Sequence, residues 1–497
     1  MPKYLIAIDQ GTTSTRSILF NTQGKIVAMD QIEHAQIYPQ PGWVEHDPLE
    51  IINKTKLTLE RVVEISSVPI SDILGIGITN QRETTVLWDK DTGIPVSNAV
   101  VWQDTRTAKI CQDLISEIGN EFVRERTGLP ISTYFSAPKI KYLMEHNPEI
   151  KDKVLRKKIL FGTIDTWLIW NLTGGPSGGL HITDVTNASR TMLFNINRLE
   201  WDQELLDLLG IPNEMMPKVN SSSGHAGYAH LPFGTLPIAG ILGDQQAALF
   251  GQNCLQVGQA KNTYGTGCFI LMNTGHKPVP SKYGLITTIA YQLQNKPAQY
   301  CLEGSIAITG ALVQWPRDNL QIIKNSSEVE SLAMKVQDNG GVYFVPAFSG
   351  LFAPHWRPDA RGIITGLSHH TTSAHIARAA LEATAYQTLD VVSAMELDSG
   401  INLNLLKVDG GMSQNNLLMQ FQSDILGIKL VRPKITETTA LGAAFVAGIA
   451  LGVWNNIHDL QEIWQEDKSY LPEMAEDKRA TLTEKWRNSV SRTLNWI

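Results

Sequence analysis

The chain has 497 residues, of which 43% are hydrophobic and 18% charged, and its formal net charge is −7. This is the composition of a folded globular protein, and it excludes a disordered, collagen-like or coiled-coil chain. The acidic balance argues against a non-specific nucleic-acid binder. Because one hydrophobic core rarely exceeds about 250–300 residues, we predict two domains, residues 1–250 and residues 251–497.

The cysteines and the apolar segments indicate a cytoplasmic protein. The four cysteines are scattered and form no Cys-x-x-Cys pair, so we expect neither disulfides nor a zinc site. The apolar start Tyr4–Ile8 is too short for a signal peptide. The apolar run Ala440–Trp454 falls short of the roughly 20 residues needed to cross a bilayer. We therefore predict a buried helix there and no transmembrane segment.

The first predicted elements are strands separated by turns. Three apolar segments, 4–8, 15–20 and 25–29, are joined by short turns, which is typical of an antiparallel meander. The pattern then predicts two more strands and a helix, at residues 72–79, 84–88 and 161–172.

The same design starts again in the middle of the chain. A short apolar strand, 238–242, ends at Gly243, and segments 261–263 and 268–272 flank a Gly/Thr turn. This repeat suggests two halves of related architecture. The remaining predicted elements alternate strand and helix: residues 342–345, 371–399, 405–408 and 416–426. Such alternation predicts an α/β fold.

Several common motifs are missing from the sequence. It contains no GxxxxGK[ST] loop, no GxGxxG after a strand, no protein-kinase HRD or DFG, no HExxH and no GxSxG. His225 and His230 lie five residues apart without a third ligand, which favours no metal site at that pair.

The turn Asp9–Arg16, at the end of the first strand, has the chemistry of a phosphate site. Its glycine lets backbone N–H groups close on an anion, and Asp9 can hold Mg²⁺ directly or through water. The side chains that would add donors to the anion are Thr12, Thr13, Ser14 and Arg16. An ordinary Thr-rich hairpin turn would show the same pattern, and this alternative stays open.

Two later turns also follow apolar strands. Gly243–Gln246 places Asp244 at a strand end, where its carboxylate either faces a cleft or caps a helix over 245–250. Asp409–Asn415 contains paired glycines, which allow a flat ligand such as adenosine to approach the backbone. A glycine-rich turn between strand and helix is the alternative for this third segment.

In their order and separation, the three turns resemble the phosphate-1, phosphate-2 and adenosine turns of the actin/hexokinase/Hsp70 ATPase superfamily. Longer strings resemble the FGGY family of carbohydrate kinases, and the resemblance covers roughly residues 4–460. These strings are Asn80-Gln-Arg-Glu83, Trp102-Gln-Asp-Thr-Arg106, Gly243-Asp-Gln-Gln-Ala-Ala-Leu-Phe-Gly251, Asn262-Thr-Tyr-Gly-Thr-Gly-Cys-Phe269 and Asp409-Gly-Gly411.

The resemblance implies two ribonuclease-H-like α/β domains flanking a deep catalytic cleft. It implies in-line phosphoryl transfer from ATP to glycerol, giving sn-glycerol 3-phosphate, with Asp244 as general base and Mg²⁺ near Asp9 and Asp244. The residues implied to hold glycerol are Arg82, Glu83, Tyr134, Asp244 and Gln245, with Trp102 and Phe269 against its carbon face. Those implied for the nucleotide are Thr12, Thr13, Ser14, Arg16, Thr266, Gly310, Gln314, Gly411 and Asn415. We also expect a homo-oligomer that binds no nucleic acid.

Two other functions are compatible with parts of the pattern. One is an FGGY kinase for another polyol or a ketose; the pair Arg82–Glu83 with Tyr134 and Phe269 favours the small triol. The more distant one is an actin-like or Hsp70-like ATPase, which would need no Asn-Gln-Arg-Glu segment. Taken alone, Arg82–Glu83 is more typical of a salt bridge, and Trp102 and Phe269 are more typical of core packing.

One loop carries a regulatory question. Some family members bind fructose 1,6-bisphosphate through a Gly-Gly-Thr-Arg loop just before the second turn, but the stretch Leu231–Pro237 has neither Arg nor Lys. We expect weak or no inhibition by this bisphosphate. In some Gram-positive members a histidine near this loop is phosphorylated by the carrier protein HPr. His230 is present without the flanking aromatic residues of those loops, so we expect no activation by HPr.

Overall fold

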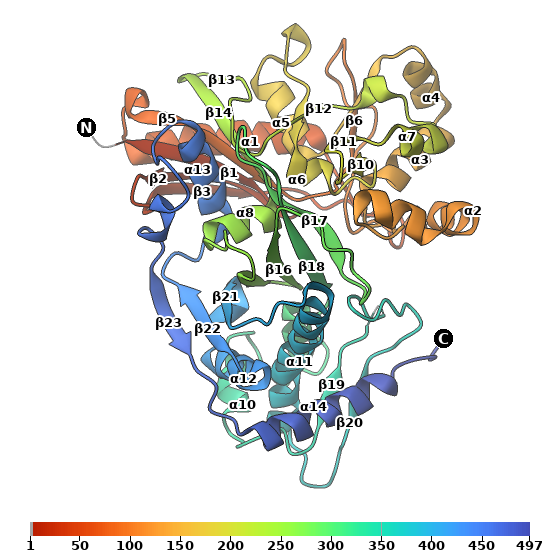
Figure 1. Cartoon of the computed structure of the whole chain (residues 1–497), viewed down its shortest axis with the longest axis vertical. Coiled ribbons are helices and arrows are strands. Elements are labelled where there is room, and N and C mark those ends of the chain that lie inside the picture. Colours follow the sequence, from red (N-terminus) through yellow and green to blue (C-terminus); the bar gives the residue numbers. More distant parts are fainter. Residues whose placement is uncertain (1–2, 349) are drawn as a thin grey trace.

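The computed structural model describes residues 3–348 and 350–497 and contains two large sheets (Figure 1). The strands of the first sheet, in spatial order, are β13 (Tyr228–Leu231), β14 (Gly234–Gly243), β5 (Ile73–Asn80), β1 (Tyr4–Gln10), β2 (Ser14–Asn21) and β3 (Ile26–Glu33). The segment β1–β2–β3 is an antiparallel meander, as predicted, and β5 and β14 run parallel to β1.

The second sheet repeats this plan. Its order is β17 (Ile286–Tyr291), β18 (Gln299–Ile306), β16 (Cys268–Gly275), β15 (Ala260–Tyr264), β21 (Leu405–Asp409), β22 (Lys429–Pro433) and β23 (Glu466–Tyr470). Strands β15, β16 and β18 are antiparallel, while β21 and β22 run parallel to β15 and to each other. The predicted internal repeat and the α/β class are both confirmed.

The helices and the short strands complete the two halves. The helices are α1 (Pro48–Ser66), α2 (Ala108–Thr127), α3 (Ser136–His146), α4 (Pro148–Leu155), α5 (Ile164–Leu172), α6 (Val185–Ala188), α7 (Gln203–Leu209), α8 (Asp244–Gly251), α9 (Gly310–Asp318), α10 (Glu328–Ala333), α11 (Ser373–Ser399), α12 (Asn416–Leu426), α13 (Thr438–Ala450) and α14 (Glu476–Ser491). The short strands are β4 (Glu45–His46), β6 (Val86–Asp89), β7 (Ala99–Val100), β8 (Ile159–Gly162), β9 (Ile182–Asp184), β10 (Phe194–Asn195), β11 (Glu200–Trp201), β12 (Lys218–Asn220), β19 (Tyr343–Val345) and β20 (Ile363–Thr365).

Two predicted helices differ from the observed ones. The prediction of a helix over 161–172 was wrong at its start, because residues 159–162 form β8, which pairs with β6, and the helix begins at Ile164. Short apolar runs fit a buried strand and a buried helix equally well, which explains the error. The predicted buried helix 440–454 is α13, which ends at Ala450. Within the described residues, no helix is long and apolar enough to cross a membrane.

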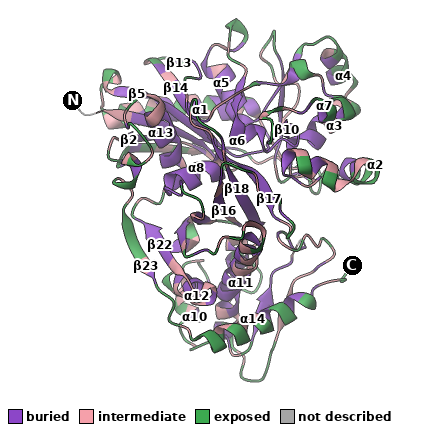
Figure 2. Ribbon diagram, viewed as in Figure 1, coloured by how far each residue is buried: buried purple, intermediate pink, exposed green. Residues whose placement is uncertain are grey.

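Strand β1 is buried on both faces, which explains its uninterrupted apolar sequence. Ile6 and Ile8 face one side and belong to a core shared with α1 and α5. Leu5 and Ala7 face the other side, in a core that includes residues of α8 and α13. Figure 2 shows buried residues in the central strands of both sheets, whereas exposed residues gather on the edge strand β23 and on outer helices such as α14.

Helix α13 lies against the first sheet although it comes late in the chain (Figure 1). Glycines permit this close approach, because a Cβ at Gly77 of β5 would collide with the Ala443 carbonyl. Helices α8 and α13 also cross in backbone contact. A Cβ at Gly442 would collide with the Ala247 carbonyl, and one at Gly251 with the Thr438 carbonyl. The two halves of the chain are therefore joined by a closely packed helix pair.

Candidate active site

Three parallel strands of the first sheet end at the same level. In the strand register, Gln10 of β1 and Gly243 of β14 both lie opposite Asn80 of β5. The turns that follow these strands therefore leave the same edge of the sheet, where open α/β sheets bind ligands. These turns contain three features that the sequence predicted for a ligand site: the phosphate-1 turn, the Asn-Gln-Arg-Glu segment and Asp244.

Arg82 is buried at this edge and contacts carboxylates from both halves of the chain. Its Nε lies 3.0 Å from Asp244 Oδ1. Its Nη1 and Nη2 donate to Glu303 on β18, at 2.5 and 3.1 Å. Burial raises the pKa of Asp244, and the charges of Arg82 and Lys261 oppose that shift. Asp244 is the first residue of α8, and its side chain is 29% exposed, so one face of the carboxylate is open to a ligand.

Glu83 is held by a residue that the sequence analysis did not select. Its Oε1 accepts a hydrogen bond of 2.6 Å from Arg190 Nε, and Arg190 Nη2 donates to Glu303 at 3.1 Å. Glu83, Arg190 and Glu303 are each at most 1% exposed. Burial acts to raise the pKa of Glu303, but the two arginines outweigh it and lower that pKa to about 2. Five side chains of alternating charge thus form one continuous network, which we call the charge chain. Its members, in order of contact, are Glu83, Arg190, Glu303, Arg82 and Asp244.

Three aromatic side chains form a wall beside the charge chain. The rings of Trp102 and Tyr134 meet edge to face at 5.5 Å, and those of Trp102 and Phe269 at 6.4 Å. All three residues are half-buried, so part of each ring remains available to a ligand. Trp102 Nε1 donates to Thr12 Oγ1 at 3.0 Å and so connects the wall to the phosphate-1 turn. The structure therefore brings these three predicted residues together with Arg82 and Glu83.

Gln245 is less available than the sequence suggested. Its Oε1 accepts a hydrogen bond of 2.5 Å from Lys261 Nζ, and the same ammonium group also donates to Thr263. Burial lowers the pKa of Lys261 to about 8. Lys261 was not selected from the sequence. Gln245 can present its amide N–H₂ group to a ligand, while its oxygen is occupied.

The phosphate-1 turn is formed, with Arg16 already engaged. Gly11 N donates to Ser14 O at 2.9 Å, which closes the turn. Arg16 contacts Asp9 at 2.6 Å and Glu437, just before α13, at 2.7 Å. Two carboxylates therefore already pair with Arg16 in this structure. Thr12, Thr13 and Ser14 lie on this turn as predicted.

The strand ends of the second sheet surround a cavity of about 440 Å³. Its lining includes every C-terminal residue predicted for the nucleotide: Thr266, Gly310, Gln314, Gly411 and Asn415. Thr263 of β15 pairs with Asp409 of β21, so the turns after these strands meet at this edge. The β15–β16 hairpin links the two sites, because Thr266 lines the cavity and Phe269 stands in the aromatic wall.

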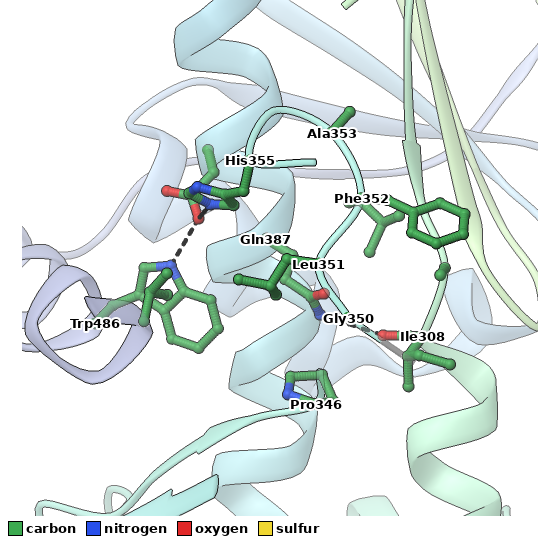
Figure 3. A pocket seen from close by; sticks show the side chains of 13 residues that line it. Ile308, Pro346, Gly350, Leu351, Phe352, Ala353, His355, Gln387 and Trp486 are labelled. Atoms are coloured by element: carbon green, nitrogen blue, oxygen red, sulfur yellow. Dashed lines mark hydrogen bonds and ion pairs between the residues drawn. The ribbon is translucent and has the colours of Figure 1, made fainter. Parts of the chain in front are cut away.

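Another cavity, shown in Figure 3, contains no predicted residue. It measures about 20 Å³ and lies between α11, α14 and the loop that carries His355. Trp486 Nε1 donates to Asp390 at 2.8 Å on one side of it. This volume suffices for one water molecule and is far too small for a nucleotide.

The described residues contain no group of three or more His, Cys, Asp or Glu side chains arranged to hold a metal ion. Asp9 and Asp244, the two predicted metal-site residues, each contact an arginine instead. Mg²⁺ in phosphoryl-transfer enzymes usually keeps several waters and takes one or two carboxylates plus phosphate oxygens. The carboxylates here suit a magnesium ion that arrives with a nucleotide, and they do not form a protein cage.

A buried charged site and an open cavity, on two related sheets, have the arrangement of the actin-like ATPase fold. The chain belongs to the FGGY family of carbohydrate kinases, whose N-terminal domain matches residues 4–251 and whose C-terminal domain matches residues 260–451.

Individual relatives extend over the whole chain. It is 56% identical to a glycerol kinase from Roseiflexus sp. (strain RS-1), with 100% of both chains covered. The crystal structure of Plasmodium falciparum glycerol kinase with ADP superposes with a TM-score of 0.93 at 40% identity, covering 99% of this chain and 98% of that one. A xylulose kinase from Lactobacillus acidophilus has a TM-score of 0.88 at 23% identity, covering 99% and 97%, and shows the fold alone.

Proposed function

We propose that this enzyme transfers the γ-phosphoryl group of ATP to glycerol, forming sn-glycerol 3-phosphate. The observation that carries the proposal is the position of Asp244: a partly exposed carboxylate beside Arg82, whose guanidinium lies 6.0 Å from the centre of the Phe269 ring in the aromatic wall. The proposal is supported by full-length relatives described as glycerol kinases, at 56% identity in the Roseiflexus protein.

Glycerol fits this arrangement chemically. Its three hydroxyls need donors and acceptors, which Arg82, Glu83 and the amide of Gln245 supply. Its carbon face needs an apolar surface, which Trp102, Tyr134 and Phe269 supply. A site built from directed hydrogen bonds rejects analogues that lack a hydroxyl, because buried polar groups are then left unpaired.

Asp244 then acts as general base. Its carboxylate accepts the proton of the attacking hydroxyl, and its raised pKa strengthens it for this role. The neighbouring Arg82 opposes that rise. The remaining catalytic requirement is alignment of the hydroxyl with the transferred phosphoryl group, since phosphoryl transfer depends mainly on positioning and electrostatics.

The nucleotide is proposed to lie in the 440 Å³ cavity, with its phosphates directed to the phosphate-1 turn. Support comes from the Plasmodium relative, whose structure was determined with ADP. Mg²⁺, when bound with ATP, would neutralise phosphate charge, with Asp9 and Asp244 as the nearest candidate ligands. We further propose a homo-oligomeric enzyme that acts in the cytoplasm, with domains at residues 1–250 and 251–497.

The decisive experiment is a coupled ADP-release assay with glycerol, dihydroxyacetone, erythritol and xylulose. We expect the highest kcat/KM with glycerol. A higher kcat/KM with xylulose or erythritol would favour an FGGY kinase for another substrate. ADP release that is independent of all four, together with MgATP-dependent light scattering, would favour an actin-like filament.

A further inference from the structure

Arg190 contacts several parts of the glycerol site without belonging to the predicted site. It follows α6 within the string Asn187-Ala-Ser-Arg-Thr, and its side chain is completely buried. Its guanidinium reaches Glu83 through Nε and Glu303 through Nη2. The same group lies 5.6 Å from the ring centroid of Tyr134. One side chain therefore touches a charged residue and an aromatic residue of the site.

The backbone at Glu83 explains why an anchor is needed there. Glu83 has φ of 62°, a left-handed conformation that residues with a side chain rarely adopt. Such strain persists only where the surroundings hold the residue in place. The anchors at Glu83 include Arg190 on its carboxylate, and Ser136 Oγ and Thr85 Oγ1, which donate to its carbonyl at 2.9 and 3.2 Å.

Arg190 also reaches Arg82 indirectly. Glu303 Oε1 accepts one hydrogen bond from Arg190 and one from Arg82, each of 3.1 Å. The bridging carboxylate belongs to β18 in the second sheet, whereas both arginines come from the first half of the chain. The orientation of Arg82, and with it the contact to Asp244, thus depends on a carboxylate that Arg190 shares.

A role in stability alone does not account for this network. Buried ion pairs add little net stability over packed apolar side chains, because desolvation offsets their attraction. Among the described residues, Arg190 Nη1 has no hydrogen-bond partner, so the guanidinium is not optimised for pairing. The desolvation cost of this network is better explained by the role proposed for Glu83, Tyr134 and Arg82 in binding glycerol.

We propose that Arg190 is a positioning residue for polyol binding, holding Glu83 and Tyr134 directly and Arg82 through Glu303. This inference rests on the proposed function, since it concerns the same site. Loss of the two directed hydrogen bonds of the Arg190 guanidinium is expected to weaken glycerol binding. It is expected to leave the nucleotide cavity intact, because none of the charge-chain residues lines that cavity.

The test measures KM for glycerol and for ATP, kcat and the melting temperature of Arg190→Lys and Glu303→Gln. Lysine keeps the charge but cannot form two directed bonds, and glutamine keeps the volume of Glu303 while weakening its bridge. We expect both variants to raise the KM for glycerol about 10- to 100-fold, the loss typical of misplaced substrate-binding groups, with the KM for ATP within about twofold of wild type.

The matched control is Arg378→Lys. Arg378 pairs with a buried glutamate, Glu382, at 2.7 Å and lies 6.0 Å from the Phe421 ring centroid, away from the glycerol site. We expect this control to lower the melting temperature without changing either KM. Arg190→Lys and Glu303→Gln with an unchanged glycerol KM, or with equal rises in both KM values, would overturn the proposal. If the wild type itself does not phosphorylate glycerol, the proposed function fails, and calorimetric binding of glycerol to wild type and Arg190→Lys still decides the positioning role.

Discussion

The two proposed ligand sites differ in the kinds of residue that line them. The proposed glycerol site contains acidic and basic side chains that already pair with each other and are almost fully buried, as Arg82 and Glu303 illustrate. The proposed nucleotide cavity of about 440 Å³ is lined by glycines, by polar residues such as Asn415 and by apolar residues such as Val313 and Leu381. A small triol offers little surface, so its recognition depends on oriented hydrogen bonds. A nucleotide offers a large surface, and glycine backbones let it approach closely.

This difference implies different sensitivity to mutation. At the glycerol site a single substitution leaves another buried charge uncompensated, which is costly. At the nucleotide cavity, a substitution mainly changes the shape of the space that is open to the ligand.

Replacement of the proposed base tests the charged site most directly. We expect Asp244→Asn to lower kcat by about 10²- to 10⁴-fold, the usual contribution of a general base, while glycerol binding measured by calorimetry stays close to wild type. The control is Asp207→Asn, which makes the same change from carboxylate to carboxamide at an exposed position of α7. A kcat for Asp244→Asn above about a tenth of wild type would show that another group accepts the proton.

Gly411→Ala tests the cavity by shape alone. A Cβ at Gly411 would meet no described atom within 4 Å, so the free protein should tolerate the methyl group. The methyl would stand in the space assigned to the nucleotide. We expect the KM for ATP to rise about tenfold, equivalent to about 1.4 kcal/mol, with unchanged glycerol KM and melting temperature. An unchanged KM for ATP would place the nucleotide elsewhere.

Sequence patterns pointed to residues of both proposed sites, but to only part of the charged network. The turns after β1, β14 and β21 are visible because glycine and polar residues follow apolar strands directly. Glu303 was missed, although a lone charge within the apolar strand Gln299–Ile306 is a usable signal. Arg190 gave no such signal, because its two partners lie far from it in the sequence. Glu83 is 107 positions before it and Glu303 is 113 positions after it. The α/β class was predictable because predicted strands and helices alternate, and the two ribonuclease-H-like domains were predicted from the resemblance of the motifs to the FGGY family.

Simultaneous binding should bring the two sites together. Because the ligands are assigned to different halves, we expect glycerol and a non-hydrolysable ATP analogue to draw the halves closer and exclude water. Small-angle X-ray scattering should show a smaller radius of gyration with both ligands than with either alone. An unchanged radius would mean that the free enzyme already has the catalytic arrangement.

The smallest effect is expected at a surface that neither site uses. A cavity of about 690 Å³ lies beside the β13–β14 hairpin, and His230 and Lys218 line it. Among its described lining residues, Lys218 is the one permanently charged cation, whereas fructose 1,6-bisphosphate needs cationic partners for two phosphates. We expect no inhibition by this compound at sub-millimolar concentration in the ADP-release assay. Inhibition in that range would reveal an anion site formed from other residues.

The position of α13 has a consequence for how the chain folds during synthesis. Strand β14, the last central strand of the first sheet, is complete at Gly243, but the helix that covers one face of this sheet ends about 200 residues later, at Ala450. At about 5–20 residues per second, the ribosome needs roughly 10–40 s to supply it. During that interval the apolar face formed by Leu5, Ala7 and their neighbours lacks its partner. Nascent chains stalled before residue 438 should therefore be more sensitive to protease and bind more chaperone than chains stalled after the helix has left the ribosome.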